Sequence, residues 1–312
     1  MPPTSPVAAS LAAAVLAVAG QAVVAAEPPA FSGARAMAHL EAICALGPRP
    51  SGSPAMTRQR TLLATHFRAA GATVVGQAFQ IRDRRTGAPV HVENLIVTWH
   101  PDRADRVLLG AHYDTRPFPD RDPVQPRGVF VGANDGASGV ALLMELAAAM
   151  PSLPGPLGVD FVLFDAEEYV FGPRDPYCVG SASFARQHAA DRRAGRLTHD
   201  YRCGVVVDMV ADRDLAIWQE HNSIDWPDTR PVVDGIWEVA RRLGVRQFVP
   251  RPRHRVEDDH VPLRMIAGIP TCDIIDFDYP AWHTTDDTPE RCAGESLEAV
   301  GRVLLTWLRE QR

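Results

Sequence analysis

The strongest constraint on the fold is a set of three short apolar segments that each end in ionisable side chains. They are RVLLGAHYD (106–114), GVDFVLFDAEE (158–168) and CGVVVDMV (203–210). Apolar runs of this length without polar alternation are typical of strands buried on both faces of a sheet. Segments of helical spacing lie between them, the clearest being SGVALLMELAAAM (138–150). This alternation predicts an α/β fold with helices on both faces of the sheet.

The preceding part of the chain predicts two helices and a pair of strands. ARAMAHLEAICALG (34–47) and AMTRQRTLLATHFRAAG (55–71) have apolar residues at helical spacing, and each stops at a glycine. ATVVGQAFQI (72–81) and HVENLIVTWH (91–100) follow as two strands joined by a polar turn. We therefore expect a single-domain α/β/α sandwich with a mixed, mostly parallel central sheet.

The N-terminal 26 residues form a separate unit. MPPTSPVAASLAAAVLAVAGQAVVAA has no charged side chain, is rich in Ala and Val, and ends in small residues before EPPAF. This pattern predicts a secretory signal peptide (1–26) cut after Ala26, with an uncleaved N-terminal anchor as the alternative. We expect residues 27–312 to form one domain that is exported to the periplasm or secreted.

Charge and composition narrow the possible partners. The net charge is −6, and Lys and Arg are not concentrated in any segment, so nucleic acid is excluded as an expected partner. No later stretch has the length and apolarity of a membrane span, so we expect no stable membrane insertion, and we expect a monomer.

The cysteines either form one or two bridges or are buried as small apolar residues. They are Cys44, Cys178, Cys203, Cys272 and Cys292.

Ionisable side chains gather at the carboxyl ends of the three predicted strands. In open α/β sheets the functional site lies outside that edge. Carboxylates brought together in this way repel one another and are costly to bury unless a cation neutralises them. The set contains imidazole and carboxylate groups without cysteine, which suits a catalytic zinc site with an open position. The residues are His112, Asp114, Asp165, Glu167, Glu168, Asp208, and Asp135 in the loop GANDGASG.

Five motifs occur in the order found in a known enzyme family. GAHYDT, GANDGASG, FVLFDAEE, VVVDM and WHTTDD resemble the metal-site motifs of the zinc-dependent aminopeptidases, and GPRPSGSP is similar to that family's early segment. The resemblance covers nearly all of residues 27–312 and implies a single zinc-dependent catalytic domain with the zinc aminopeptidase-like fold. It implies zinc ligands at Asp135, Glu168 and His283, and a general base at Glu167.

Two further positions of the resemblance concern a second metal ion. His112 and Asp208 occupy the positions that hold a second zinc in the dinuclear peptidases. Glutaminyl cyclases, the branch of the same fold that makes N-terminal pyroglutamate, keep a His and an Asp at these positions yet bind a single zinc. The ligands alone therefore do not discriminate between the branches. We expect one zinc for a cyclase, and one or two for an aminopeptidase.

Other segments favour the cyclase branch. VEDDHVPL (256–263), DYPAWHTTDDT (278–288) and YVFGPRDPYCVGSASFA (169–185) are similar to glutaminyl cyclases. In that branch a Trp precedes the last His ligand, and an Asp-Asp-His-x-Pro segment supplies an acid near the general base. The preferred interpretation is therefore a glutaminyl cyclase acting on peptides or proteins with N-terminal Gln. A zinc aminopeptidase is the alternative, and a peptide-binding domain without catalysis is a third hypothesis.

The resemblance also implies roles for residues that do not bind the metal. Asp208 and Asp258 resemble acids that share a short hydrogen-bond network with Glu167 and tune its protonation. Two carboxyl groups in such contact seldom both ionise, so the network can store a proton. Trp282 and Tyr279 fall beside the substrate, where Trp282 is expected to form a wall of the pocket.

The chain departs from the cyclase pattern at two places. Vertebrate cyclases have a Trp in the loop after the Glu pair, where this chain offers Tyr169, Phe171 or Tyr177. They also have a His in the strand before the Trp-His motif, where this chain has Asp273. Neither departure touches the expected zinc ligands. His260 is expected to cap or pack at the start of a helix and not to bind a metal.

Overall fold

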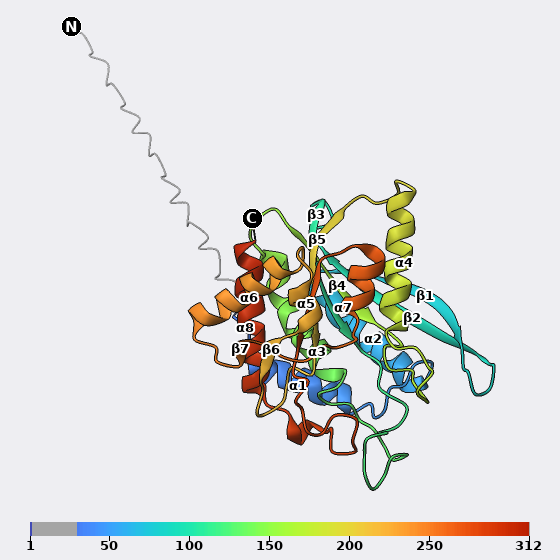
Figure 1. The fold of residues 1–312 in the computed structure, drawn as a ribbon. Helices are drawn as coiled ribbons and strands as arrows, with labels where there is room; N and C mark the ends of the chain where they lie inside the picture. The colour runs from blue at the N-terminus through green and yellow to red at the C-terminus, as the bar shows by residue number, and fades with distance from the viewer. Residues whose placement is uncertain (2–29, 312) are drawn as a thin grey trace.

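The structure is a computed structural model that describes Met1 and residues 30–311 (Figure 1). The predicted signal peptide, residues 1–26, lies outside the described residues except for Met1. Among the helices of the described part, none is both long enough and apolar enough to span a bilayer.

A six-stranded sheet forms the centre of the molecule (Figure 1). Its strand order is β1-β2-β4-β3-β5-β8, with β4, β3, β5 and β8 parallel and β2 antiparallel to both of its neighbours. The strands of this sheet are β1 (Thr73–Arg82), β2 (Pro89–Trp99), β3 (Asp105–His112), β4 (Gly158–Phe164), β5 (Asp200–Asp208) and β8 (Thr271–Ile275). A separate parallel pair consists of β6 (Ile217–Gln219) and β7 (Phe248–Pro252). The predicted mixed, mostly parallel sheet is confirmed.

Helices cover both faces of the sheet, as predicted. Figure 1 shows α6 and α8 on one side and α4 on the other. Along β3, Val107 and Leu109 face the larger core, which α1, α2, α3, α6 and α8 share, whereas Leu108 faces a second core under α4. The helices are α1 (Gly33–Cys44), α2 (Pro54–Ala69), α3 (Ala137–Leu146), α4 (Val179–Arg193), α5 (His221–Asp225), α6 (Arg230–Leu243), α7 (His260–Pro262) and α8 (Gly294–Glu310). Burial on both faces explains why these strands are apolar without alternation.

The central strands end earlier than their apolar runs predict. The run 158–168 forms a strand only as far as Phe164, and the run 106–114 only as far as His112. After β4 the chain turns at Ala166, whose φ of 59° is incompatible with a strand. The ionisable residues beyond β4 therefore lie in a turn, and their directions are set by that turn and not by strand alternation.

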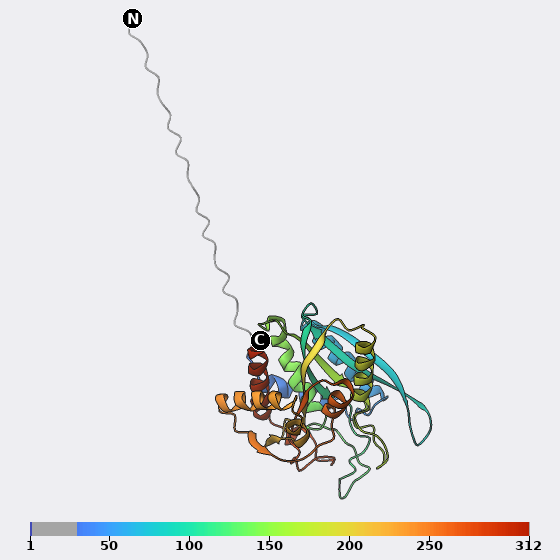
Figure 2. The same ribbon diagram turned by 45° about the horizontal axis from the view of Figure 1, so that its top comes forward.

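Strands β1 and β2 form a long hairpin at one edge of the sheet. They pair without interruption from Thr73 opposite Thr98 to Arg82 opposite Pro89. Figures 1 and 2 both show this hairpin extending past the body of the molecule. The hairpin is the antiparallel part of the mixed sheet.

Helix α3 lies very close to the sheet. A Cβ at Gly139 would lie 2.3 Å from the carbonyl oxygen of Val207 on β5 and 3.1 Å from the Cβ of Ala111 on β3. Only a glycine permits this approach. The contact brings the N-terminus of α3, and Asp135 just before it, to the carboxyl ends of the two strands.

The five cysteines are all free and buried. This agrees with the second of the two expectations for them, that they pack as small apolar residues. Burial also raises the pKa of Cys44 and of Cys203 to about 12, so both thiols stay protonated.

Candidate active site

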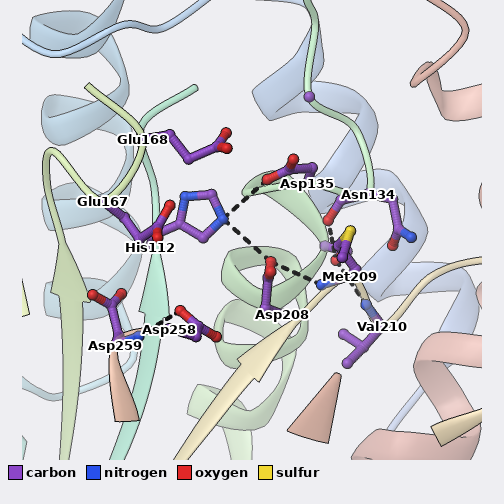
Figure 3. A network of polar contacts seen from close by, with 12 residues as sticks. His112, Asn134, Asp135, Glu167, Glu168, Asp208, Met209, Val210, Asp258 and Asp259 are labelled. Carbon is purple, nitrogen blue, oxygen red and sulfur yellow. Dashed lines mark hydrogen bonds and ion pairs between the residues drawn. The ribbon is translucent and has the colours of Figure 1, made fainter. Parts of the chain in front are cut away.

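Several of the predicted site residues converge at the carboxyl ends of the parallel strands (Figure 3). His112 is the last residue of β3 and Asp208 the last residue of β5. Glu167 and Glu168 follow β4, and Asp135 lies two residues before the start of α3. Figure 3 shows His112 between Asp135 and Asp208, with Glu168 close by. Strands far apart in sequence thus supply one cluster of charged groups.

The three expected zinc ligands lie together and are buried. The Nε2 atom of His283 is 2.7 Å from Oε1 of Glu168 and 3.4 Å from Oδ2 of Asp135. One potential ligand atom from each residue falls within 4.8 Å of the other two. Oδ2 of Asp135 and Oε2 of Glu168 are buried without a hydrogen-bond partner. Buried carboxylate oxygens are normally paired, so these two call for a partner.

The electrostatics of this cluster fit a divalent cation. Burial, reinforced by the Glu168 carboxylate, raises the pKa of Asp135 to about 8. Burial acts on Glu168 in the same direction, but the neighbouring His283 outweighs it and the pKa of Glu168 falls to about 2. A cation among the three would neutralise both carboxylates and give the free oxygens a partner. Two carboxylates and an imidazole at one side of a cavity suit zinc with an open coordination position.

A second cluster shares Asp135 with the first. Nε2 of His112 lies 3.2 Å from Oδ1 of Asp135 and 3.2 Å from Oδ1 of Asp208, as the dashed lines in Figure 3 show. Burial disfavours the charged imidazole, yet Asp208 and the other carboxylates outweigh this effect and raise the pKa of His112 well above its ordinary value. The cluster can therefore be held together by a proton on His112 or by a second cation.

Asp114 holds the backbone of both glutamates, whose side chains have different partners. The Asp114 carboxylate accepts hydrogen bonds from the backbone N–H groups of Glu167 and Glu168, both at 3.1 Å. Glu168 reaches His283, whereas Oε1 of Glu167 accepts a contact of 3.4 Å from the Cys178 thiol. Burial, with repulsion from nearby carboxylates, raises the pKa of Glu167 well above its ordinary value. This favours a role for Glu167 in proton transfer.

Three residues of the site have a left-handed backbone although they are not glycines. They are Ala166 (φ 59°), Met209 (φ 47°) and His283 (φ 57°). Two of them directly adjoin Glu167 and Asp208, and the third is itself an expected ligand. Conformations of this kind cost energy and occur where the surrounding structure enforces them, often at functional sites.

Asp258 lies between Glu167 and a buried acid, Asp273. It has a ligand-type atom within 4.8 Å of Glu167, and another set of such atoms joins Asp258, His260 and Asp273. Burial, with repulsion by Asp208, raises the pKa of Asp258 to about 6; burial, with repulsion by Asp258, raises that of Asp273 well above its ordinary range. Of the two acids, Asp273 is therefore the one whose protonated form is more strongly favoured. Asp208 and Asp273 are thus the acids that lie near Asp258, and the expected hydrogen-bond network of Asp208 and Asp258 with Glu167 stays a prediction.

His260 is fully buried behind Asp258. Its ring nitrogens lie 3.4 Å from Oε2 of Glu220 and 3.6 Å from Oδ2 of Asp273. It opens α7, which continues into a π-helical turn, Leu263–Ala267. Its position at the start of this helix agrees with the packing role expected from the sequence.

A small cavity of about 200 Å³ adjoins the ligand cluster. Trp282 lies in its wall, as predicted, and packs against Phe277 with ring centroids 4.6 Å apart. Of the three aromatic residues considered for the loop after the Glu pair, Tyr177 reaches the cavity, whereas the Tyr169 hydroxyl donates to Asp83. The cavity is lined by Asp135, Glu167, Glu168, Tyr177, Asp208, Met209, Arg255, Val256, Glu257, Asp258, Ile275, Phe277, Trp282 and His283.

Tyr279 and Asp165 lie apart from this cavity. The Tyr279 hydroxyl donates to Oδ1 of Asp287 at 2.9 Å, and the same carboxylate accepts the backbone N–H groups of Asn134 and Asp135. Tyr279 thus supports the loop of a ligand, and its position gives no support to the expected contact with substrate. Asp165 accepts hydrogen bonds from Ser51 and the backbone of Glu93, away from the site.

Comparisons with known proteins agree with this geometry. The model of peptidase family M28 matches residues 94–308. A glutaminyl-peptide cyclotransferase of Gloydius blomhoffii is 27% identical over 243 residues, which are 70% of this chain and 65% of that protein. The chain thus spans just under two thirds of the length of this curated relative.

Solved structures of both branches are similar to the chain over most of its length. The glutaminyl cyclase of Fimbriiglobus ruber has 37% identity and a TM-score of 0.87, covering 94% of this chain and 100% of that one. A leucine aminopeptidase precursor from Bacteroides thetaiotaomicron has 27% identity and a TM-score of 0.84, covering 92% and 99%. The predicted resemblance is confirmed: the chain belongs to peptidase family M28, within its glutaminyl cyclase branch.

Proposed function

We propose that this protein is a zinc-dependent glutaminyl-peptide cyclotransferase, which converts the N-terminal Gln of peptides or proteins to pyroglutamate and releases ammonia. The observation that carries the proposal is the small cavity whose wall contains Trp282 together with the ligand cluster and Glu167. A cavity of this size, with Phe277 and Ile275 in its wall, suits one uncharged side chain. The likeness to the Fimbriiglobus ruber glutaminyl cyclase supports it.

Glu167 would move the proton that the reaction must transfer, since it lines the cavity and its pKa is raised by burial. The α-amine of the substrate attacks the carbonyl carbon of its own side-chain amide, forming one C–N bond while the bond to the amide nitrogen breaks. Glu167 accepts a proton from the attacking amine and delivers it to the departing ammonia. Asp135, Glu168 and His283 would hold a zinc ion, which would supply a Lewis acid next to the amide carbonyl.

The pocket contributes by positioning the two ends of one residue. Ring closure is intramolecular, so holding the amine and the amide in contact supplies much of the rate. Trp282 and Phe277 place two packed aromatic rings in the cavity wall, and a substrate side chain that fills the cavity against them would displace water and favour attack by the amine over hydrolysis of the side-chain amide.

The first test is the substitution Glu167→Gln. We expect ammonia release from a Gln-initiated peptide to fall by about 10²–10⁴-fold, because the proton carrier is lost while the zinc ligands remain. Zinc content, measured by atomic absorption, should equal that of the native protein. Glu238→Gln, on the surface of α6 where Glu238 pairs only with arginines, is the matched control and should have native activity. Near-native turnover by the Glu167 variant would remove this residue from the mechanism.

An aminopeptidase remains the second candidate because His112, Asp135 and Asp208 form a second possible metal cluster. The two functions predict different products and different metal contents. A cyclase should leave a blocked N-terminus and hold about one zinc per chain, whereas a two-zinc aminopeptidase should release free Leu or Ala from peptides that begin with them. Finding such release together with two tightly bound metal ions would reject the cyclase proposal.

The cellular setting belongs to the same proposal. We infer that the domain acts after export, as the apolar sequence at residues 1–26 predicts, and as a monomer. Intact Glu167 and a complete ligand cluster argue against a peptide-binding domain without catalysis.

A further inference from the structure

The loop between β3 and α3 contacts Trp282 and His283. None of the sequence motifs indicated these contacts. Three consecutive residues of this loop, Asp120, Arg121 and Asp122, each contact the segment 282–285. We call these three residues the clasp. The contacts join parts of the chain more than 160 residues apart.

Asp120 contacts the side of His283 that faces away from the expected metal. Its Oδ1 atom lies 3.1 Å from Nδ1 of His283. A hydrogen bond donated by Nδ1 leaves Nε2 as the free lone pair, and Nε2 is the atom directed at Glu168 and Asp135. Asp120 thus selects both the tautomer and the orientation of the ring.

Arg116 connects Asp120 to a second ligand. Its guanidinium donates to both carboxylate oxygens of Asp120, at 2.6 and 3.0 Å, and lies 3.4 Å from Oε1 of Glu168. The Arg116 side chain is only 5% exposed, whereas that of Asp120 is 50% exposed. The buried arginine therefore holds an otherwise mobile surface carboxylate in one position.

Arg121 acts on the neighbouring Trp282. Its guanidinium carbon lies 3.8 Å from the centroid of the indole ring, and its backbone N–H donates to the carbonyl of His283 at 3.1 Å. Phe277 packs against the same indole. The indole ring therefore contacts both a cation and an aromatic residue.

Asp122 anchors the far end of the segment. Its Oδ2 atom accepts the backbone N–H of Thr285 at 2.9 Å and also the Thr285 hydroxyl. Between these anchors His283 has a left-handed backbone, with φ of 57°. A non-glycine residue keeps this conformation only where neighbouring contacts impose it.

We propose that Asp120 and Arg121 are positioning residues with separate tasks, Asp120 fixing the His283 imidazole for zinc and Arg121 fixing Trp282 for the substrate. The task of Arg121 rests on the proposed function, whereas that of Asp120 rests only on the zinc site. The two tasks can therefore be tested by different measurements.

The Asp120 task is tested by zinc affinity, measured on the purified protein by competition with a chromophoric chelator. We expect Asp120→Ala to weaken zinc binding by about 10–100-fold. Asp120→Asn should lose less, because its amide oxygen still accepts the Nδ1 hydrogen bond. Asp286→Asn is the matched control, since Asp286 is an exposed acid directly after the segment 282–285 and its side chain pairs with Arg291. Native affinity in both Asp120 variants would overturn the proposal, and Asp120→Asn decides it if the alanine variant does not fold.

The Arg121 task is tested by steady-state kinetics with a Gln-initiated peptide. Arg121→Ala should raise KM by about three- to fivefold with zinc affinity unchanged, while Arg121→Lys keeps the cation and restores part of the effect. Arg127→Ala is the control, because Arg127 stacks on Phe118 and not on Trp282. An unchanged KM, or a loss of zinc equal to that of Asp120→Ala, would contradict the division of tasks. If the native protein does not cyclise Gln at all, the proposed function fails, and the zinc measurements still decide the role of Asp120.

Discussion

At the scale of single residues, the site depends on carboxylates that are not themselves expected to bind metal. Asp114 accepts the N–H groups of both glutamates, and Asp287 accepts those of Asn134 and Asp135. Each orders the backbone that carries a charged side chain, so the ligands are held before any cation arrives. Such outer contacts set both the geometry and the affinity of metal sites.

A residue far from the site makes folding stability depend on pH. His188 is buried on α4, and its Nε2 lies 3.4 Å from a guanidinium nitrogen of Arg192, which can donate only to a neutral ring. Burial, with repulsion by Arg192, lowers the pKa of His188 to about 4 from a usual value near 6.5. The fold therefore favours the neutral ring. The contribution of the neutral ring to the free energy of unfolding is complete above pH 6.5. It is lost as the pH falls from that value toward 4.

We expect the titration of His188 to lower the free energy of unfolding by about 1–2 kcal/mol between neutral pH and pH 4. Urea unfolding at a series of pH values measures this loss. In His188→Gln, which cannot titrate, the free energy of unfolding should decline less over the same range. An identical decline in the variant and the native protein would show that other groups are responsible.

The residues of the candidate metal cluster could be predicted from sequence, but the residues that hold them in place could not. Asp135, Glu168 and His283 lie in short local motifs, so each is recognisable where it stands. Asp120 lies in a polar, Pro-containing loop, and its partner is 163 positions away. Its role depends on how two loops pack, which local spacing does not encode. Tyr279 illustrates the same limit, since its position in the motif suggested a substrate contact, whereas in the structure its hydroxyl donates to Asp287.

At the scale of secondary-structure elements, the packing of α3 decides where Asp135 lies. Gly139 allows the helix to contact the backbone of β5 directly. A bulkier residue would push the helix outward, and with it the loop that carries Asp135.

We expect Gly139→Ala to lower the free energy of unfolding by about 1–3 kcal/mol, because the added methyl would meet a backbone carbonyl that cannot move aside. Chemical denaturation measures the change. Gly235→Ala is the matched control, since that helical position places its Cβ no closer than 3.3 Å to Trp307. The α3 interpretation fails if both variants are equally stable.

At the scale of the whole molecule, the candidate zinc site joins segments from across the chain. Asp135, Glu168 and His283 come from three separate loops. A cation bound to all three favours the folded chain, in which alone they are together. Removing it leaves two buried carboxylates that repel each other.

Chelation should therefore lower thermal stability. We expect EDTA to reduce the melting temperature of the zinc-loaded protein by about 5–10 °C, as measured by scanning calorimetry. Asp135→Asn lacks a ligand, so its melting temperature should hardly respond to EDTA. Equal melting temperatures for the native protein with and without chelator would argue against stabilisation of the fold by bound zinc.

The architecture was more predictable than the ends of its elements. Alternating apolar runs and helical segments required a sheet covered on both faces, and the sheet has that form. The run 158–168 did not reveal that β4 stops at Phe164. The apolar residues of this run favoured a longer strand. The turn at Ala166 depends on contacts with the surrounding site, which the local sequence does not show.

The left-handed residues of the site have a consequence for anyone who engineers this protein for heat resistance. Glycine adopts that conformation without steric cost, so replacing Ala166 or Met209 by glycine would relieve local strain. The same replacement would loosen the backbone beside Glu167 or Asp208, where rigidity serves function. At these positions, a substitution that raises thermal stability is therefore expected to lower turnover. A screen for stability that does not measure activity would select variants that are poorer catalysts.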